Sequence, residues 1–364
     1  AEGTTSILAS LVSAPSSVLL EQIAVLRDLV QDETLAGLHL EGPFITKSMC
    51  GAQDPAAIID GDPALLQQWL EAGRGTVRSL TLAPETPHFV ELVRLCRDYG
   101  VVPSLGHTNA TAELTREVLA GVSGGIRGAG AGAPAGAGAG AGAGGAAGAG
   151  APGAEAGPWS ATHLFNRMPP LGHRAAGPVA VLLQAAEKSP GQVVLELIAD
   201  GVHLDPEIVR MVFNLVGPGS IALITDAMAA AGMSDGRYTL GSLDVLVRDR
   251  VARLAPARDL GSTEEEEPGA IAGATSFLLE NVRGCVEWGI PLADAVAAAT
   301  STPARLMGLD RVRGDQHATS RVGAIAAGYR ADVLVATEEL ELVQAFRAGT
   351  PQTQEGNDRA DSSV

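Results

Sequence analysis

The sequence predicts an α/β barrel with a small β-sandwich beside it. Short apolar runs alternate along the chain with amphipathic helical stretches, and this order is typical of a parallel sheet or barrel. Two later segments, 237–255 and 320–347, instead alternate apolar and polar residues with a period of two and turn at glycines, as sandwich hairpins do. A length of 364 residues suits one barrel with a small attached domain.

Seven strands of the barrel are expected from the apolar runs. They lie at 5–12, 35–40, 77–82, 101–105, 161–165, 193–199 and 221–225. Helices are expected at 16–30, 63–72, 87–99, 111–119, 206–216, 275–288 and 292–307. Asp205 precedes one of these helices, and we expect it to act as a cap because a carboxylate can accept hydrogen bonds from the free N–H groups of a first turn.

The predicted domain organisation follows from these elements. Barrel elements fill 1–236, sandwich hairpins 237–273, the last barrel helices 274–310, returning sandwich strands 320–349, and a disordered tail 350–364. The insertion at 124–158 is almost pure glycine and alanine, too poor in bulky side chains to bury a core, and we expect a flexible loop rather than stacked strands. The insertion at 256–268 carries four consecutive glutamates and is typical of an exposed hairpin tip.

Composition narrows the possible partners. A net charge of −17 repels phosphate backbones and anionic headgroups, so neither nucleic acid nor a membrane surface is expected as a partner. No run of eighteen apolar residues occurs, and no signal-peptide pattern follows Ala1. The three cysteines form no close-spaced motif, which suits a reducing compartment. We therefore expect a cytoplasmic protein that acts on a small molecule.

Polar residues stand at the ends of five separate apolar strands, where a barrel places its chemistry. They are Glu41, His107, His163, His203 and Asp226. Any one of them could be an ordinary core or capping residue, but buried histidines of that kind have no reason to gather at one end of the strands. His39 shares a strand face with Glu41 by the period of two, and we assign it to the surroundings of the site rather than to a ligand.

A glutamate with two histidines is a common ligand set for a catalytic zinc or a similar divalent ion that keeps one position open for water. A metal lowers the pKa of such a water toward neutrality and makes it a usable nucleophile. Asp226 is then suited to take the proton and return it to a leaving amine. The alternative for Asp226 is a cap of the following segment.

Five motifs carry a resemblance to a known family. In chain order they are GLHLEGPF, SLGHTNAT, ATHLFNRMPPLGHR, ELIADGVHL and LITDAMAAAGMSDGRY. Together they resemble the motif series of the N-acetylglucosamine-6-phosphate deacetylases, which belong to the amidohydrolase superfamily. The resemblance runs from Gly3 to about Gly349 outside the two insertions. It implies a (β/α)8 TIM-like barrel with a small β-sandwich, a homodimer, and metal-dependent removal of the acetyl group from the sugar phosphate.

The resemblance also implies roles for single residues. It makes Glu41, His107 and His163 the ligands of a divalent metal ion, with zinc favoured over iron, manganese, cobalt or cadmium, and it makes Asp226 the general base and acid. The residues that it places against the substrate are Ala52, Gln53, Asn166, Arg167, Arg174, His203, Ile271, Ala272 and Gly273. Family members often supply the arginine that matches Arg174 from a neighbouring subunit, and a planar fork of donors suits phosphate.

The chain departs from the family pattern at several positions. Gln53 stands where a histidine commonly helps to polarise the acetyl carbonyl, and glutamine can donate a hydrogen bond but carries no charge. Arg167 replaces a usual alanine, so that it either adds a phosphate contact or blocks the pocket. Gly172 replaces a frequent histidine, and Ala175 and Ala176 stand where Glu-Pro is common.

The first barrel strand of the family, which ends in a His-x-His motif, is not found upstream of the segment that begins at Gly3. We therefore expect a barrel without its first strand, as a truncated chain or a misplaced gene start would give, with a natural seven-stranded relic as the alternative. Two other functions remain open at this point. One is an inactive remnant that only binds sugar phosphate or a partner subunit, and the other is an amidohydrolase that acts on a different N-acyl amine.

Overall fold

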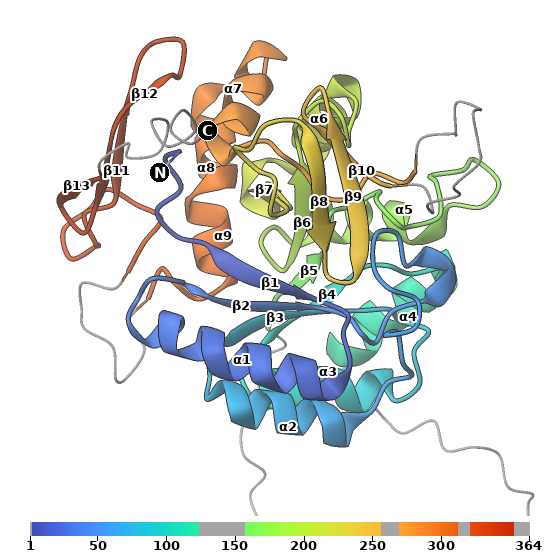
Figure 1. Ribbon diagram of the computed structural model, residues 1–364. Helices are drawn as coiled ribbons and strands as arrows, with labels where there is room; N and C mark the ends of the chain where they lie inside the picture. Colours follow the sequence, from blue (N-terminus) through green and yellow to red (C-terminus); the bar gives the residue numbers. More distant parts are fainter. Residues whose placement is uncertain (1, 124–156, 256–268, 312–320, 353–364) are drawn as a thin grey trace, which may run out of the picture.

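The computed structural model in Figure 1 describes residues 2–123, 157–255, 269–311 and 321–352. Its centre is a curled parallel sheet of seven strands, which pair in sequence order from β1 to β7. The strands are β1 Leu8–Val12, β2 Gly37–Glu41, β3 Val77–Leu82, β4 Val102–Leu105, β5 Trp159–Ala161, β6 Val193–Ile198 and β7 Ile221–Ile224. Within the described residues β1 and β7 are the two edges, and the sheet stays open between them.

Helices alternate with the strands and cover the outer face of the sheet. They are α1 Ser16–Gln31, α2 Pro63–Gly73, α3 Phe89–Asp98, α4 Ala112–Ser123, α5 Gly177–Lys188, α6 Pro206–Val216, α7 Leu278–Glu287, α8 Leu292–Ala299 and α9 Ser301–Leu306, with short 3-10 turns η1 Lys47–Met49 and η2 Pro218–Ser220. The predicted cap of α6 is confirmed, because the side chain of Asp205 accepts from the N–H of Glu207 at 2.8 Å. In the described parts of the chain, none of the helices combines the length and apolar character that a membrane span requires.

The main core lies between the sheet and this helical layer. Leu80 and Leu82 of β3 are fully buried there, and Trp69 of α2 stacks on Phe44 with the ring centroids 5.3 Å apart. The other face of β3 is polar, because Thr81 turns toward the inside of the barrel and bonds to His39. This division leaves the concave side of the sheet free for polar chemistry at its carboxyl end.

Two antiparallel sheets of three strands each complete the fold. One consists of β8 Gly236–Leu240, β9 Leu243–Arg248 and β10 Val251–Leu254, and the other of β11 Val333–Ala336, β12 Leu342–Arg347 and β13 Thr350–Gln352. They lie on different sides of the molecule, the first in yellow and the second in red (Figure 1). The first packs around Met228 and Ala230, directly after β7. The predicted class of fold, a barrel with a small β domain, is confirmed.

Most predicted elements are confirmed within a few residues, but three are wrong in part. The strand expected at 161–165 ends at Ala161, because positive φ angles at His163 (31°) and Phe165 (77°) turn the backbone out of the ladder. The helix expected at 292–307 is interrupted at Thr300, whose φ and ψ of −133° and −80° are not helical. Residues 350–352 form β13 rather than part of a disordered tail.

Some expectations concern parts of the chain that the structure does not describe. The flexible loop falls almost wholly on 124–156, the acidic tip on 256–268, and the rest of the tail on 353–364. Strands in the segment 320–347 begin only at Val333, after a turn with positive φ at Gly323 and Gly328. The division into domains stays a prediction.

Candidate metal centre and substrate pocket

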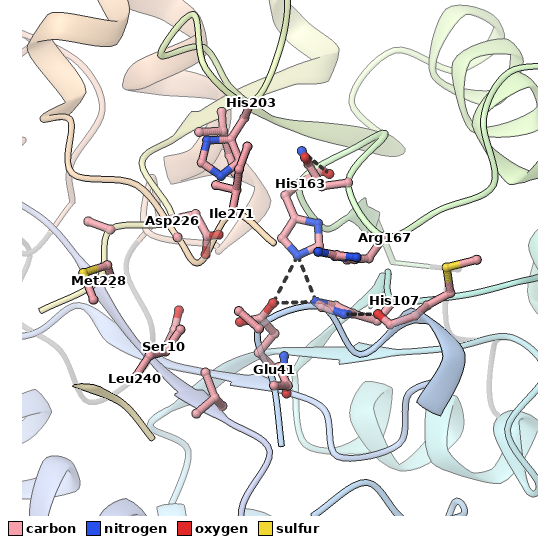
Figure 2. Close-up of a pocket in the computed structure, with 18 of the residues that line it drawn as sticks. Ser10, Glu41, His107, His163, Arg167, His203, Asp226, Met228, Leu240 and Ile271 are labelled. Carbon is pink, nitrogen blue, oxygen red and sulfur yellow. Dashed lines mark hydrogen bonds and ion pairs between the residues drawn. The ribbon is translucent and has the colours of Figure 1, made fainter. Parts of the chain in front are cut away.

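A pocket of about 380 Å³ opens at the carboxyl ends of the barrel strands. Glu41 is the last residue of β2, while His107 and His163 each stand two residues beyond their strands. Their side chains meet at one point (Figure 2). Nε2 of His107 lies 2.8 Å from Oε1 of Glu41, and Nε2 of His163 lies 3.1 Å from both of these atoms. The three residues predicted as ligands therefore converge.

The chemistry of this cluster suits a cation. Nδ1 of His107 bonds to the backbone carbonyl of Met49 at 2.8 Å and must donate there, so the neutral ring presents the lone pair of Nε2 to the cluster. Three acceptor atoms so close together repel one another unless a proton or a metal ion lies among them. All three side chains are at least nine-tenths buried, so water cannot relieve that repulsion, and the donor set fits a divalent metal.

The pKa values of Glu41 and His163 show which side chain carries the proton when a proton, rather than a metal ion, lies among the three acceptor atoms. Burial by itself would raise the pKa of Glu41, but hydrogen bonds with His107 and His163 hold it well below its usual range. Burial would lower the pKa of His163, but the contact with Glu41 raises it to about 9. A proton is therefore held on His163 at neutral pH, in the position that a metal ion would replace.

Left-handed backbone conformations occur at five non-glycine residues that line the pocket, and three of them carry imidazole or carboxyl groups of the site. The φ angles are 47° at His107, 31° at His163 and 50° at Asp226. A non-glycine residue rarely adopts such angles, and they persist only where the surrounding structure enforces them. Here each of the three residues stands two positions beyond the end of a barrel strand. The same local geometry at three strand ends supports a functional centre.

Asp226 follows the end of β7 and faces the group formed by Glu41, His107 and His163 (Figure 2). Burial raises the pKa of Asp226 to about 7, the charge of Glu41 acts in the same direction, and His163 and His203 oppose it. The segment after β10 fixes its backbone, because the N–H of Ala274 donates to the carbonyl of Asp226 at 2.9 Å. Gly273 is required in this segment, since a Cβ atom there would lie 2.9 Å from the same carbonyl oxygen.

Comparisons with known proteins agree with this geometry. No family model matches the chain. It is 27% identical to the N-acetylglucosamine-6-phosphate deacetylase of Bacillus subtilis, over 96% of this chain and 74% of that protein. It is 30% identical to the N-acetylgalactosamine-6-phosphate deacetylase of Escherichia coli O157:H7, over 96% of this chain and 77% of that protein.

Solved structures show the same relationship. A mutant N-acetyl-D-glucosamine-6-phosphate deacetylase from Mycobacterium smegmatis, in complex with N-acetyl-D-glucosamine-6-phosphate, matches with a TM-score of 0.76 and 35% identity, over 96% of this chain and 77% of that chain. The enzyme from Thermotoga maritima matches with a TM-score of 0.73 and 28% identity, over 96% and 79%. The chain belongs to the N-acetylglucosamine-6-phosphate deacetylase family.

Most residues that a member of this deacetylase family is expected to place against its substrate do line the pocket. They are Ala52, Gln53, Asn166, Arg167, His203, Ile271 and Gly273. Two others do not. Ala272 is fully buried beneath the lining, next to Met228, and Arg174 lies exposed on the segment before α5. Within the described chain, Arg174 does not reach the pocket.

Two departures from the deacetylase family pattern can be placed. The backbone N–H of Ser13 donates to Oε1 of Gln53 at 2.9 Å, and a backbone nitrogen cannot accept, so the amide group of Gln53 has one orientation. Its Nε2 is buried and has no partner in the described structure. Arg167 passes over Gly51, where a Cβ atom would lie 2.6 Å from its Nε, and forms one wall of a pocket that stays open.

Several residues at the site were missed from the sequence. Asp200 holds His203, because its carboxylate bonds to Nδ1 of the ring at 2.8 Å and to the N–H of the same residue at 2.8 Å. The Asp-x-x-His spacing after β6 was a usable signal for this pair. The apolar lining was also missed, and it comes from Met49, Phe165, Met168, Met228 and Leu240. Phe165, Met168 and Met228 lie in loops, where no periodicity marks them, while Met49 ends η1 and Leu240 ends β8.

A polar belt runs across the inside of the barrel below the cluster. His39 bonds to Ser10 of β1 at 2.9 Å and to Thr81 of β3 at 2.8 Å, and Thr81 bonds in turn to Thr162 at 2.7 Å. Thr162 completes the chain with Ser104 of β4 at 2.6 Å. Burial lowers the pKa of His39 to about 4, so this ring is neutral and serves the belt. Its expected place beside the ligands rather than among them fits these contacts.

Proposed function

We propose that this chain hydrolyses the N-acetyl group of N-acetylglucosamine 6-phosphate to give glucosamine 6-phosphate and acetate. The observation that carries the proposal is the convergence of Glu41, His107 and His163 opposite Asp226 in one pocket, in a chain of this deacetylase family. Relatives of both epimeric specificities are similar to the chain, and a similar solved structure contains the glucosamine derivative.

Glu41, His107 and His163 would hold one divalent ion, and we favour zinc because one carboxylate with two imidazoles suits it. When bound, the ion supplies a Lewis acid that lowers the pKa of a water molecule and polarises the acetyl carbonyl. The chain itself contributes the position of the ligands. The carbonyl of Met49 accepts from Nδ1 of His107, so Nε2 is the nitrogen that faces the ion.

Asp226 manages the proton of the reaction. It accepts a proton from the attacking water as the new C–O bond forms, and it returns a proton to the amine nitrogen as the C–N bond breaks. A carboxylate at its ordinary pKa is a weak base at neutral pH and takes a proton from water poorly. Burial raises the pKa of Asp226 above its ordinary value, which makes this carboxylate a stronger base toward the attacking water.

The remaining polar residues hold the substrate. Nε2 of Gln53 has two unused N–H groups, and we assign them to the acetyl carbonyl, the role that the histidine of other family members is expected to fill. His203, held by Asp200, and the amide of Asn166 are suited to sugar hydroxyls and phosphate. The guanidinium of Arg167 makes no hydrogen bond or ion pair with the described residues and is available to the phosphate.

The assembly and compartment are also part of the proposal. Arg174 lies exposed outside the pocket, and we propose that it serves the phosphate of a partner subunit in a homodimer. The cysteines Cys50, Cys96 and Cys285 are all free, which suits the cytoplasm.

Turnover assays test the reaction directly. The metal-loaded protein is incubated with N-acetylglucosamine 6-phosphate, its galactosamine epimer and unphosphorylated N-acetylglucosamine, and released acetate is measured. We expect the first sugar phosphate to be the best substrate. Preference for the epimer would support the activity of the Escherichia coli relative instead. Binding without acetate release would indicate an inactive chain, and equal turnover without the phosphate would contradict the sugar phosphate assignment.

A further inference from the structure

A second crevice lies at the end of the barrel strands opposite to the pocket, between the parallel sheet and the sheet β11–β13. It encloses about 60 Å³ and is lined by Arg78, Arg330 and Arg347, with Ser6 and Glu33 among its other neighbours. Arg78 is the second residue of β3, Arg347 is the last of β12, and Arg330 precedes β11. Three arginines around so small a space are unusual in a chain with a net charge of −17.

Arg78 is the residue that needs an explanation. It is only 6% exposed, its Nε is buried without a hydrogen-bond partner, and no carboxylate pairs with it in the described residues. Its side chain packs over Gly37, where a Cβ atom would lie 2.3 Å from its Cγ, so the strand beneath gives it room. A buried charge without a partner is strongly unfavourable, and such a group normally has a counter-charge.

The other two arginines are fixed by the chain itself. Arg330 pairs with Asp332 at 2.6 Å and bonds to Oγ of Ser6 at 3.0 Å, so its charge is already matched. Arg347 donates to the backbone carbonyls of Glu33 and Thr34 and forms no ion pair with the described residues. Hydrogen bonds with Thr34, and to a smaller extent the charge of Arg347, lower the pKa of the exposed Asp32. The lining therefore holds two arginines whose charges no ion pair matches, against one exposed carboxylate, that of Glu33.

We propose that this crevice binds a small oxyanion of the phosphate class, with Arg78 as its buried contact and Arg347 as its second. A guanidinium presents a planar fork of N–H donors that matches phosphate oxygens, and its charge strengthens each hydrogen bond. The crevice is small, about 60 Å³ against about 380 Å³ for the substrate pocket, which suits a small ion better than a whole sugar phosphate. The ion joins the barrel to the small sheet, because Arg78 belongs to the first and Arg347 to the second.

Titration calorimetry with inorganic phosphate tests the site, together with melting curves in phosphate and in chloride at equal ionic strength. We expect phosphate to raise the melting temperature saturably while chloride does not, because only a ligand that binds the folded state stabilises it in this way. Arg78→Met and Arg347→Met should each weaken binding at this site by about tenfold or more, which corresponds to the loss of one charge-assisted hydrogen bond. Acetate and glucosamine 6-phosphate, in separate arms, distinguish a free phosphate from a carboxylate or a phosphate ester.

The control is Arg116→Met, which removes an exposed arginine from α4 and should leave phosphate binding unchanged. Deacetylation by Arg78→Met should stay within about twofold of the parent protein, which separates this site from the phosphate contacts of the pocket. Binding of phosphate by both crevice variants with unchanged affinity would overturn the proposal, as would equal stabilisation by chloride. If Arg78→Met does not fold, Arg347→Met decides the question by itself, because that side chain lies nearer the surface.

Discussion

Nδ1 of His107 and the backbone carbonyl of Met49 lie 2.8 Å apart, and this contact fixes which nitrogen of the ring faces Glu41. Met49 belongs to the short turn η1, which follows β2, so the segment that begins with Glu41 at the end of β2 also supplies the group that orients His107. Met49, which is not itself a ligand, thus orients the ring so that Nε2 can bind a cation. The predictions below test the cluster and the residues that surround it.

Replacing His107 with alanine should remove both the metal and the turnover. Glu41 and His163 alone offer too few ligand atoms to hold a divalent ion tightly, and the carbonyl of Met49, which contacts the ring of His107, cannot replace a ring nitrogen. Metal content per chain by mass spectrometry and acetate release are the measurements. His88→Ala is the matched control, since this histidine is exposed and its ring contacts Glu91. Full activity of His107→Ala without bound metal would refute the ligand assignment.

Metal affinity should fall as the pH is lowered. Without the ion, contact with Glu41 raises the pKa of His163 to about 9 from its ordinary 6.5, so this ring carries a proton at neutral pH that the metal must displace. Metal binding at pH 7 to 8 should therefore release close to one proton, and its apparent affinity should rise with pH up to about 9. Calorimetry in buffers of different ionisation enthalpy measures the proton release. No release in this range would show that His163 is neutral before the metal binds.

Asp226→Asn should abolish the chemistry while metal content and substrate binding remain. Loss of a general base lowers the rate by ~100- to 10,000-fold. In the parent protein the ionised carboxylate is the base, so activity should rise with pH through its pKa and be lost below it. Burial places that pKa at about 7, and a bound cation favours the ionised form, so the acid limb should lie between 3.8 and 7. Asp28→Asn on the exposed face of α1 is the control. Activity of Asp226→Asn within threefold of the parent would show that another group is the base.

Gly273→Ala should lower turnover through the position of Asp226. The new Cβ atom would lie 2.9 Å from the carbonyl oxygen of Asp226, and the residue would also have to keep a φ of 72°. We expect a loss of kcat by about tenfold or more, because small displacements of a catalytic group are costly. Gly289→Ala has a similar φ of 89° and no atom within 4 Å, so it reports the backbone strain without the collision. Equal activity of the two variants would contradict this account.

The elements and the ligands could be predicted because periodicity and strand ends are local properties of the sequence. Glu41, His107 and His163 each follow an apolar run, and parallel strands bring their carboxyl ends to one edge. The end of β5 could not be placed, because ATHLF has the composition of a strand while its backbone turns at His163. The partner of Gln53 and the surroundings of Arg78 could not be predicted either. Ser13 lies 40 residues from Gln53, and the crevice around Arg78 joins segments that are more than 200 residues apart.

Gln53 provides the last prediction, because its amide group is fixed by Ser13 and its Nε2 has no partner. If those N–H groups bind the acetyl carbonyl, their removal in Gln53→Ala should lower kcat by ~100-fold, the usual effect of losing one donor to a developing oxyanion. Gln53→Glu keeps the shape, accepts from Ser13 in the same way and replaces the donor by a charged acceptor, so it should be at least as inactive. Gln53→His restores the residue that other family members are expected to have and should retain more activity than either. Because the alanine change could also loosen β1 through Ser13, the melting temperature of each variant is measured beside kcat. Activity of Gln53→Glu equal to that of the parent protein would exclude Nε2 as a donor to the substrate.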